Sequence, residues 1–374
     1  MTTGPNLKRT ALYPCHLKYG GRIIDFAGWA LPVQFTSIIQ EHRAVRSGAG
    51  LFDVSDMGEL EVTGDQALEL LQHAVTADLA RVRPGRVAYS PMCNHEGGVV
   101  DDILIYALSG GRYIAVVNAA NIEKDFRWLE GLARQWPRAR VRNRSDEFAQ
   151  LALQGPRSVA ILQPLTGTDV GAMGYYRAVE QVDVAGIRCS VLSRTGYTGE
   201  DGFEFYCEPG DAPSLWEALL EAGRVHGLVP AGLGSRDTLR LEAGMPLYGQ
   251  ELDDRRTPIE AGLDRFVALG KGPFVGREAL LRQREGGRAL ALVGLEMVDR
   301  GVPRTGYPIL REGEEIGYVT SGTYAPSLDR HIGMGYVPPG LAAPGTAMEV
   351  KIRDRIAAAK LVRLPFYCRE EDGK

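Results

Sequence analysis

From about Ala289 onward the chain consists of short apolar segments separated by glycine and proline. The segments read ALVGLEMV, GYPIL, EEIGYVTSG, HIGMGYV, AMEVKI and AAAKLVRLPFY. Runs of this length, bounded by turn-forming residues, are typical of short strands. The pattern therefore predicts a small β-barrel or Greek-key domain in this part of the chain.

One barrel accounts for only part of the 374 residues. A single hydrophobic core rarely supports a chain of this length, so we expect two or three domains. Strand 58–64 and a helix after Asp65 are followed by strands at 87–92, 99–108 and 112–118, with turns at 94–98 and 109–111. This order predicts an antiparallel meander, followed by a helix that carries Trp128.

The segment from about Asp146 to Gly249 also mixes helices with strands. The predicted elements are strand FAQLALQG, helix PRSVAILQPL, strand RCSVLSRTGY, strand FEFYC and a helix around Trp216–Val225. They lack the regular alternation of a doubly wound fold, so the fold class is α+β. Nearer the start, Ser37 followed by Gln40 has the capping-box form and predicts a helix to about Arg46.

Composition excludes several classes of function. A net charge of −4 and a pI near 6.0 argue against a nucleic-acid partner. We find no apolar leader and no apolar run of about 20 residues, as a membrane span requires. The five cysteines and six histidines are dispersed, without the close spacing of zinc sites. We therefore expect a soluble, cytoplasmic, metal-free protein. The motifs of α/β-hydrolases and P-loop NTPases are also missing from the sequence.

The segment GGVVDDILIY contains two adjacent aspartates, Asp101 and Asp102. Side chains alternate along a strand, so the two carboxylates point to opposite faces. Asp102 shares its face with Val100, Leu104 and Tyr106. A carboxylate on an apolar face is costly unless it is hydrogen-bonded, which suggests a function. The alternative, about as well supported, is that both aspartates end the preceding turn at the solvent edge.

Two further motifs carry candidate ligand-binding residues. The glycines of SRTGYTGEDGFEFY do not follow the dinucleotide fingerprint, and Glu204 is either a ligand-binding carboxylate or a surface strand residue. In GLGSRDTLRLE, Arg236 and Arg240 are four residues apart and share a helical face. They form either a fork for a carboxylate or an ion-paired, solvated face, and the pattern favours the solvated face.

These segments, taken in order over nearly the whole chain, resemble the T-protein family of the glycine cleavage system, the tetrahydrofolate-dependent aminomethyltransferases. The matching segments are RTALYPCHLKYGGRIIDFAGWALPVQF, LFDVSDM, YSPMCNHEGGVVDDILIY, VVNAANIEKDF, LALQGP, SRTGYTGEDGFE, AGLGSRDTLRLEAGMPLYGQELD, TSGTYAPSL and LPFY. The resemblance implies a three-domain, folate-binding cloverleaf. Its expected parts are a discontinuous first domain (1–50 plus 145–255), an inserted second domain (51–144), a linker (256–288) and the C-terminal barrel (289–374).

The resemblance also assigns roles to individual residues. The second aspartate of the GGVVDD segment, Asp102, is catalytic in this family. The family's folate contacts correspond here to Met57, Tyr89, Val116, Asn118, Tyr197, Glu204 and Arg236. Many relatives have histidine where this chain has Asp56. The family arginine near the C-terminus corresponds to Arg369 only after a shift of one residue.

The implied reaction moves an aminomethyl carbon from the lipoyl arm of a partner, the H protein, to tetrahydrofolate. Ammonia leaves, and 5,10-methylenetetrahydrofolate forms. Asp102 would accept a hydrogen bond from a folate nitrogen, and Glu204 would pair with the donor-rich edge of the pterin. Tetrahydrofolate is thus the expected co-substrate, and no metal is needed.

Two alternatives remain open at the level of sequence. One is another folate-dependent one-carbon transferase or demethylase on the same scaffold. The other is a non-catalytic folate-binding helper, which carries cysteine in a K-G-C-Y-x-G-Q-E motif. Here the corresponding stretch is KGPFVGRE, with Pro273 in the place of the cysteine, which counts against the helper.

Overall fold

The computed structural model describes residues 7–369, and this part of the chain forms two compact units. The first unit combines the chain up to Leu71 with Leu79–Tyr89 and Ile103–Asp237. The second combines Gln72–Asp78, Ser90–Asp102 and the chain from Thr238 onward. The expected division into three domains and a linker stays a prediction. The segment expected to be a linker contains helix α8 (Arg277–Gly286).

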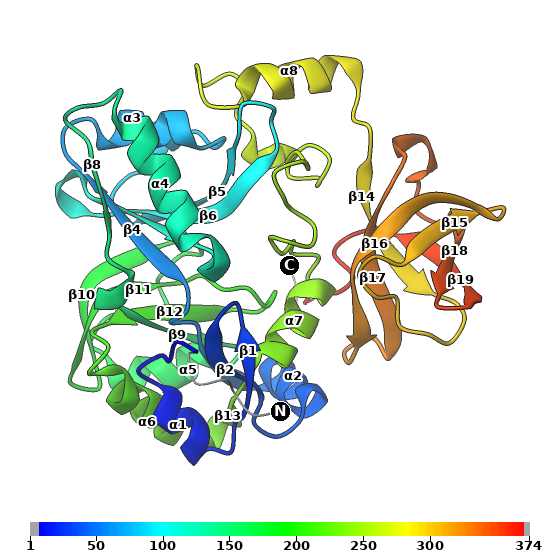
Figure 1. The fold of residues 1–374 in the computed structure, drawn as a ribbon. Coiled ribbons are helices and arrows are strands. Elements are labelled where there is room, and N and C mark those ends of the chain that lie inside the picture. The colour runs from blue at the N-terminus through cyan, green and yellow to red at the C-terminus, as the bar shows by residue number, and fades with distance from the viewer. Residues whose placement is uncertain (1–6, 370–374) are drawn as a thin grey trace. The chain divides into compact units, whose positions relative to one another are not determined.

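The first unit is built around a six-stranded sheet with the order β10-β11-β12-β9-β3-β13 (Figure 1). All neighbours pair antiparallel except β13 and β3, which are parallel. The strands are β3 (Ala49–Asp53), β9 (Ala149–Gln154), β10 (Ala178–Val184), β11 (Ile187–Ser193), β12 (Gly202–Cys207) and β13 (Leu228–Pro230). Strand β10 is missing from the sequence prediction, and β11 ends four residues before the predicted strand does.

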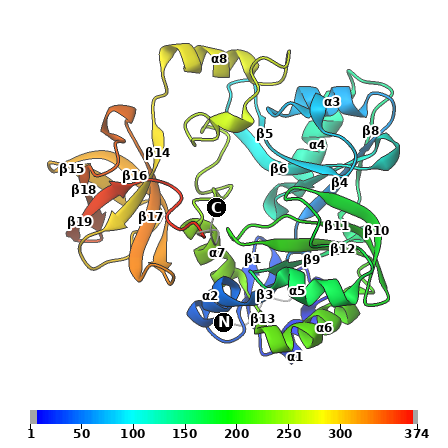
Figure 2. The ribbon, with the colours of Figure 1, turned by 180° about the vertical axis from the view of Figure 1, so that it is seen from behind.

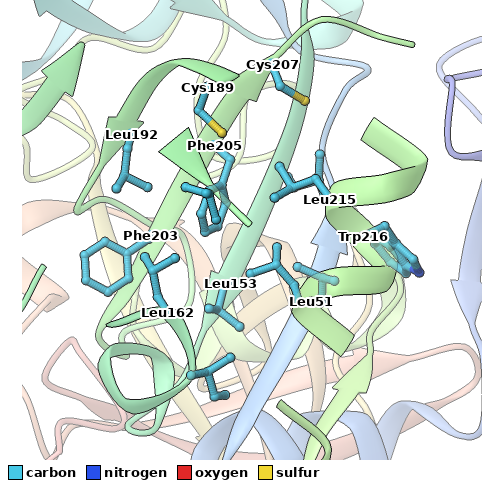
Figure 3. Packing of buried hydrophobic residues seen from close by; sticks show 14 of the residues in the cluster. Leu51, Leu153, Leu162, Cys189, Leu192, Phe203, Phe205, Cys207, Leu215 and Trp216 are labelled. Carbon is cyan, nitrogen blue, oxygen red and sulfur yellow. The ribbon is translucent and has the colours of Figure 1, made fainter. Parts of the chain in front are cut away.

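One face of this sheet is covered by helices and forms the main hydrophobic core of the unit. Helices α5 (Ser158–Leu162) and α6 (Ala212–Gly223) lie on the same side of the sheet in both views (Figures 1 and 2). Leu153, Phe203 and Phe205 meet Leu215 and Trp216 there (Figure 3). The alternation of apolar residues along β9 and β12 explains this face, because every second side chain points to the helices.

The remaining elements of the amino-terminal part surround this core. Ser37 caps helix α2 (Ile38–Ser47) by accepting a 3.2 Å hydrogen bond from the Gln40 amide, as the capping box predicts. The hairpin of β1 (Arg22–Phe26) and β2 (Trp29–Gln34) and the short helix α1 (Tyr13–Lys18) were not predicted.

A second, five-stranded sheet has the order β5-β6-β7-β4-β8, which confirms the predicted meander. Its strands are β4 (Gly58–Thr63), β5 (Arg86–Cys93), β6 (Val99–Ala107), β7 (Tyr113–Val117) and β8 (Arg140–Asn143). The helices predicted near it are α3 (Ala67–Ala74) and α4 (Ile122–Ala133), which carries Trp128. Strands β5 and β6 each contain residues of both units.

The carboxy-terminal strands close into a six-stranded barrel, coloured yellow to red in Figure 2. The order of the strands around the barrel is β14-β17-β16-β15-β18-β19. Together with the two mixed helix-and-sheet parts, this barrel confirms the predicted α+β fold class and the predicted C-terminal barrel domain. The strands are β14 (Ala291–Met297), β15 (Pro308–Arg311), β16 (Glu314–Ala325), β17 (Arg330–Val337), β18 (Ala347–Ile352) and β19 (Arg355–Val362). The segment LPFY lies beyond β19 and is not a strand, although the sequence predicted that the last strand includes it.

Candidate active site

The six-stranded sheet has a polar face opposite its helix-covered face. Tyr206 of β12 pairs with Gln150 of β9, and Glu204 pairs with Ser193 of β11. Residues paired across strands point to the same side of a sheet, so these four side chains form one row. All four are buried. A row of buried polar residues on one face marks this side of the sheet as a candidate binding site.

Glu204 is the only carboxylate in this row. The Thr195 hydroxyl donates to its Oε2, and the Gln150 Nε2 donates to its Oε1 at 3.3 Å. Burial raises the pKa of Glu204, while the Thr195 hydroxyl and the charge of Arg236 lower it. Glu204 is 9% exposed, so it is not the surface strand residue that the sequence allowed as an alternative.

The glycine-rich loop before β12 is shaped by Gln154. A Cβ at Gly196 would lie 1.9 Å from the Gln154 side-chain oxygen, and one at Gly202 would lie 2.3 Å from its nitrogen. Gln154 in turn donates to the Thr195 carbonyl at 3.0 Å. Gly199 has a φ of +75°, which glycine adopts without strain. These glycines therefore place Thr195 and Tyr197 and are not a dinucleotide motif.

Arg236 and Tyr197 form a pair beside Glu204. The guanidinium carbon lies 5.2 Å from the centre of the Tyr197 ring, a cation–π arrangement. Arg236 lies in helix α7 (Leu233–Glu242), and Glu41 anchors the start of this helix. Glu41 accepts from the Gly232 amide at 2.9 Å and from the Ser235 hydroxyl at 3.4 Å.

Arg240, one helical turn further along α7, is not available to a ligand. Its side chain is buried and donates to Glu251 at 2.9 Å and to the Ser321 hydroxyl at 2.8 Å. Of the favoured alternative, an ion-paired and solvated face, Arg240 has the ion pair but not the solvation, and the weaker alternative, a fork of Arg236 and Arg240, is wrong. The sequence misses the pairing because Glu251 and Ser321 lie beyond the helix.

The loop after β3 places Met57, and Asp53 fixes the start of this loop. Asp53 accepts from the Thr10 hydroxyl at 2.6 Å and from the Ser55 amide at 2.9 Å, and lies 3.0 Å from the His16 Nε2. Burial opposes ionisation of Asp53, but the bonds from His16, Ser55 and Thr10 hold its pKa below the ordinary value. Met57 is partly buried against the cluster described next.

Val116 of β7 belongs to an apolar cluster that joins the two sheets of the first unit. The cluster also contains Tyr106 of β6 and Tyr206 of β12, and Met57 packs against it. The structure thus brings Met57 and Val116 together next to the polar row. Tyr89 in β5 and Asn118 after β7 are partly buried, and their folate contacts stay predictions.

Two carboxyl groups near Met57 lack a complete set of partners. Asp56 and Glu59 are both buried, and the Asp56 Oδ2 and Glu59 Oε2 have no hydrogen-bond partner among residues 7–369. Burial raises the pKa of Asp56 to about 6, against the opposing charge of Arg236. Burial and the charge of Asp56 raise the pKa of Glu59 well above its ordinary value.

Asp102 lies in the second unit, within strand β6. Asn94 accepts from the Glu96 and Gly98 amides at 3.0 Å and shapes the preceding turn, and its side chain donates to the Asp254 carbonyl at 2.8 Å. Asp101 is 0% exposed, whereas Asp102 is partly exposed, as alternation requires. The aspartates are therefore strand residues, and the alternative in which both lie at the solvent edge is wrong. Of the two carboxylates, Asp102 is the accessible one.

Arg369 is exposed near the end of the described chain, and its role stays a prediction. Within residues 7–369, no group of three or more histidine, cysteine, aspartate or glutamate side chains is arranged to hold a metal ion. In the same range, no helix is long and apolar enough to cross a membrane.

Several residues that shape the polar face were missed at the level of sequence. Gln150, Thr195, Tyr106 and Tyr206 all lie around Glu204. The available signal was the alternation of polar and apolar residues in AQLALQ and GFEFY. It places Gln150 and Gln154 on one face of their strand, and Glu204 and Tyr206 on one face of theirs.

Comparison with known proteins gives consistent matches. Residues 12–271 match the model of the GCVT N-terminal domain, and residues 291–367 match that of the glycine cleavage T-protein C-terminal barrel domain. An aminomethyltransferase of Moorella thermoacetica is 54% identical, covering 97% of this chain and 99% of its own. An aminomethyltransferase of a Geobacillus species is 51% identical, with coverage of 97% and 99%.

A solved structure agrees with these relatives. The glycine cleavage system aminomethyltransferase T from Bartonella henselae superposes with a TM-score of 0.89 at 34% identity, covering 96% of this chain and 98% of its own. These matches define the class of protein, a tetrahydrofolate-dependent transferase. The chain belongs to the glycine cleavage T-protein family, and its activity is that of an aminomethyltransferase.

Proposed function

We propose that this chain takes the aminomethyl carbon from the lipoyl arm of H protein and transfers it to tetrahydrofolate. The products are ammonia, 5,10-methylenetetrahydrofolate and the dihydrolipoyl protein. The proton balance closes, because the two nitrogen-bound hydrogens of the folate end on ammonia and on the freed sulfur. The observation that carries the proposal is the buried Glu204 carboxylate on the polar face of a T-protein fold.

The polar face fits a reduced pterin. The pterin edge presents ring and amino N–H donors, and this face presents acceptors. Glu204 is buried but retains 9% exposure, and the Asp56 Oδ2 is a buried acceptor without a partner among the described residues. The flat surface of Tyr197, backed by the charge of Arg236, suits an aromatic ring. We propose Met57, Tyr89, Val116, Asn118, Tyr197, Glu204, Arg236 and Arg369 as the folate contacts.

Asp102 is proposed as the catalytic residue. Tetrahydrofolate supplies the two nucleophilic nitrogens, N5 and N10, that receive the carbon. An ionised carboxylate that accepts a hydrogen bond at such a nitrogen raises its electron density and holds the departing proton. The accessible position of Asp102 in β6 supports this role.

We also propose that the reaction needs no bound metal and takes place in the cytoplasm. All five cysteines are free thiols, which suits a reducing compartment. Metal chelation by EDTA should leave the rate of transfer unchanged. A loss of activity that zinc or another divalent cation restores would contradict the metal-free mechanism.

The direct test is ammonia release from aminomethylated H protein, measured with and without tetrahydrofolate. We expect rapid release only when folate is present, with one methylene group transferred for each ammonia. Release at the same rate without folate would show that folate does not accept the carbon. Equal turnover of a free small amine without H protein would favour a demethylase.

A further inference from the structure

A continuous line of hydrogen bonds runs through the polar face of the six-stranded sheet and ends on Glu204. Its members, which we call the donor chain, are Gln150, Tyr206, Tyr106, Ser193 and Thr195. The successive distances are 3.0 Å from the Gln150 Nε2 to the Tyr206 oxygen, 2.9 Å between the tyrosine oxygens, 3.1 Å to the Ser193 Oγ and 2.7 Å to the Thr195 Oγ1. The Thr195 hydroxyl then donates to Glu204.

Counting protons fixes the direction of the donor chain at its Glu204 end. Thr195 has one hydroxyl proton and gives it to Glu204. Ser193 must therefore donate to Thr195, because each hydroxyl has only one proton. Ser193 has then used its own proton, so Tyr106 donates to Ser193. Every proton in this half of the donor chain points toward the carboxylate.

Gln150 fixes the direction at the other end. Its amide nitrogen only donates, and it gives one hydrogen to the Tyr206 oxygen and the other to Glu204. Tyr206 is therefore left to donate to Tyr106. The Gln150 Nε2 now lies 3.3 Å from the Glu204 Oε1. If the amide were flipped, its carbonyl oxygen would take this position and would repel the carboxylate oxygen. With these directions the last two donors, the Thr195 hydroxyl and the Gln150 amide, both point to the Glu204 carboxyl group, and such an arrangement favours the ionised form.

The donor chain is positioned to act through Glu204 and not on a ligand. Its five members are at most 2% exposed, whereas Glu204 is 9% exposed. The Gln150 carbonyl oxygen is buried and has no hydrogen-bond partner among residues 7–369. Bonds that point to a single acceptor polarise one another in a low-dielectric interior, so remote members still influence the acceptor.

We propose that the donor chain is a positioning device that keeps Glu204 charged and oriented toward the N–H edge of a bound pterin. This rests on the proposed function, in which Glu204 contacts the folate. Tyr206 and Tyr106 are then positioning residues for substrate affinity, although neither is exposed to the ligand.

The charge balance around Glu204 gives this proposal a signature in pH. The groups that act on it are the Arg236 guanidinium from α7, the Tyr106 and Tyr206 phenols, the Thr195 hydroxyl and the Gln150 amide. Glu59 of β4 adds a like-charge influence on Tyr206. Burial already raises the pKa of Glu204, and removal of a donor raises it further. Folate affinity of such a variant should decline at a higher pH than that of the wild type when the solution is acidified.

The test is a double-mutant cycle read by calorimetric binding of 5-formyltetrahydrofolate, a stable reduced folate, to the full chain. Tyr206→Phe should weaken binding roughly fivefold to tenfold at pH 7.5, and Thr195→Val by somewhat more. In the Glu204→Gln background the same Tyr206→Phe change should cost less than about twofold. Tyr336→Phe is the matched control, because Tyr336 is a buried barrel tyrosine whose hydroxyl donates at 2.8 Å to the Glu251 carbonyl. It should leave folate binding unchanged.

Equal losses for Tyr206→Phe in both backgrounds, or no loss in either, would overturn the proposal. If Glu204→Gln binds folate as tightly as the wild type, the assignment of Glu204 as a folate contact fails. The role of the donor chain is then tested by measuring the free energy of unfolding in urea between pH 4 and pH 7. Tyr206→Phe should lose additional stability as the pH rises through this range, and only when Glu204 is present. A pH-independent loss, the same in both backgrounds, would show that the tyrosine has only a structural role.

Discussion

Two buried glutamates, one in each compact unit, are held in different ways. Glu251 of the second unit is 0% exposed and accepts from Arg240 at 2.9 Å, from the Leu247 amide at 3.0 Å and from the Thr320 hydroxyl at 2.6 Å. A guanidinium neutralises its charge at contact distance. Glu204 of the first unit accepts from two neutral donors, the Thr195 hydroxyl and the Gln150 amide. Arg236 lowers its pKa by charge and stacks on Tyr197.

We interpret this difference as one between a structural carboxylate, Glu251, and the carboxylate that we propose as a folate contact, Glu204. Breaking a buried ion pair leaves an uncompensated charge, so Glu251 contributes to stability as long as Arg240 is present. Glu204 accepts from neutral donors and retains some exposure, so a ligand with N–H groups can complete its coordination. Asp101 and Asp102 show the same contrast in exposure between adjacent residues of β6.

The largest effect is expected at Asp102. Asp102→Asn should keep the fold and the folate affinity but slow methylene transfer by roughly 10²–10⁴-fold, because the amide cannot accept the proton. Single-turnover ammonia release from aminomethylated H protein measures the transfer step. Asp101→Asn, at the buried neighbour, is the matched control and should act mainly on stability. If Asp101→Asn slows transfer and Asp102→Asn does not, the assignment of the two aspartates is reversed.

The next largest effect concerns Glu251. Glu251→Ala leaves Arg240 buried without its charge partner, and we expect a loss of about 3–5 kcal/mol in the free energy of unfolding. Urea denaturation at pH 7.5 measures this loss. Folate affinity, measured where the variant is still folded, should not change. A Glu251→Ala variant as stable as the wild type would remove the basis for calling this carboxylate structural.

A smaller effect, with a defined pH dependence, is expected at Asp56. Burial raises its pKa from 3.8 to about 6, so the folded protein holds this proton more tightly than the unfolded chain does. The stabilising contribution of protonated Asp56 is therefore fully present below about pH 4. It is lost as the pH rises to about 6, and it remains absent at pH 7. Asp56→Asn removes this loss and should gain about 1–3 kcal/mol over the wild type at pH 7, relative to their difference at pH 4. If the free energies of unfolding of Asp56→Asn and the wild type differ by the same amount at pH 4 and at pH 7, the raised pKa of Asp56 is contradicted.

Much of the fold follows from local sequence pattern. The short strands after Ala289 predict the barrel, Ser37 predicts the start of α2, and alternation in β6 separates Asp101 from Asp102. These features depend on neighbouring residues or on period two, which sequence displays directly.

The rest depends on which distant segments meet. Tyr106 and Tyr206 are a hundred residues apart, and only the packing of two sheets brings their hydroxyls together. The sequence favoured a solvated face for Arg240, whereas its side chain is buried against Glu251 and Ser321, which come from other parts of the second unit. Sequence pattern assigns faces to single strands but not the neighbours of each face.

The central claim is that the polar face around Glu204 binds the folate, whereas the similarly buried Glu251 serves stability. The most direct measurement is calorimetric 5-formyltetrahydrofolate affinity of Glu204→Gln beside Glu251→Gln, each with its unfolding free energy. We expect Glu204→Gln to bind roughly 10–100-fold more weakly with little change in stability, and Glu251→Gln to show the reverse. Unchanged affinity in Glu204→Gln, or an equal loss of affinity in both variants, would contradict the assignment of this face as the folate site.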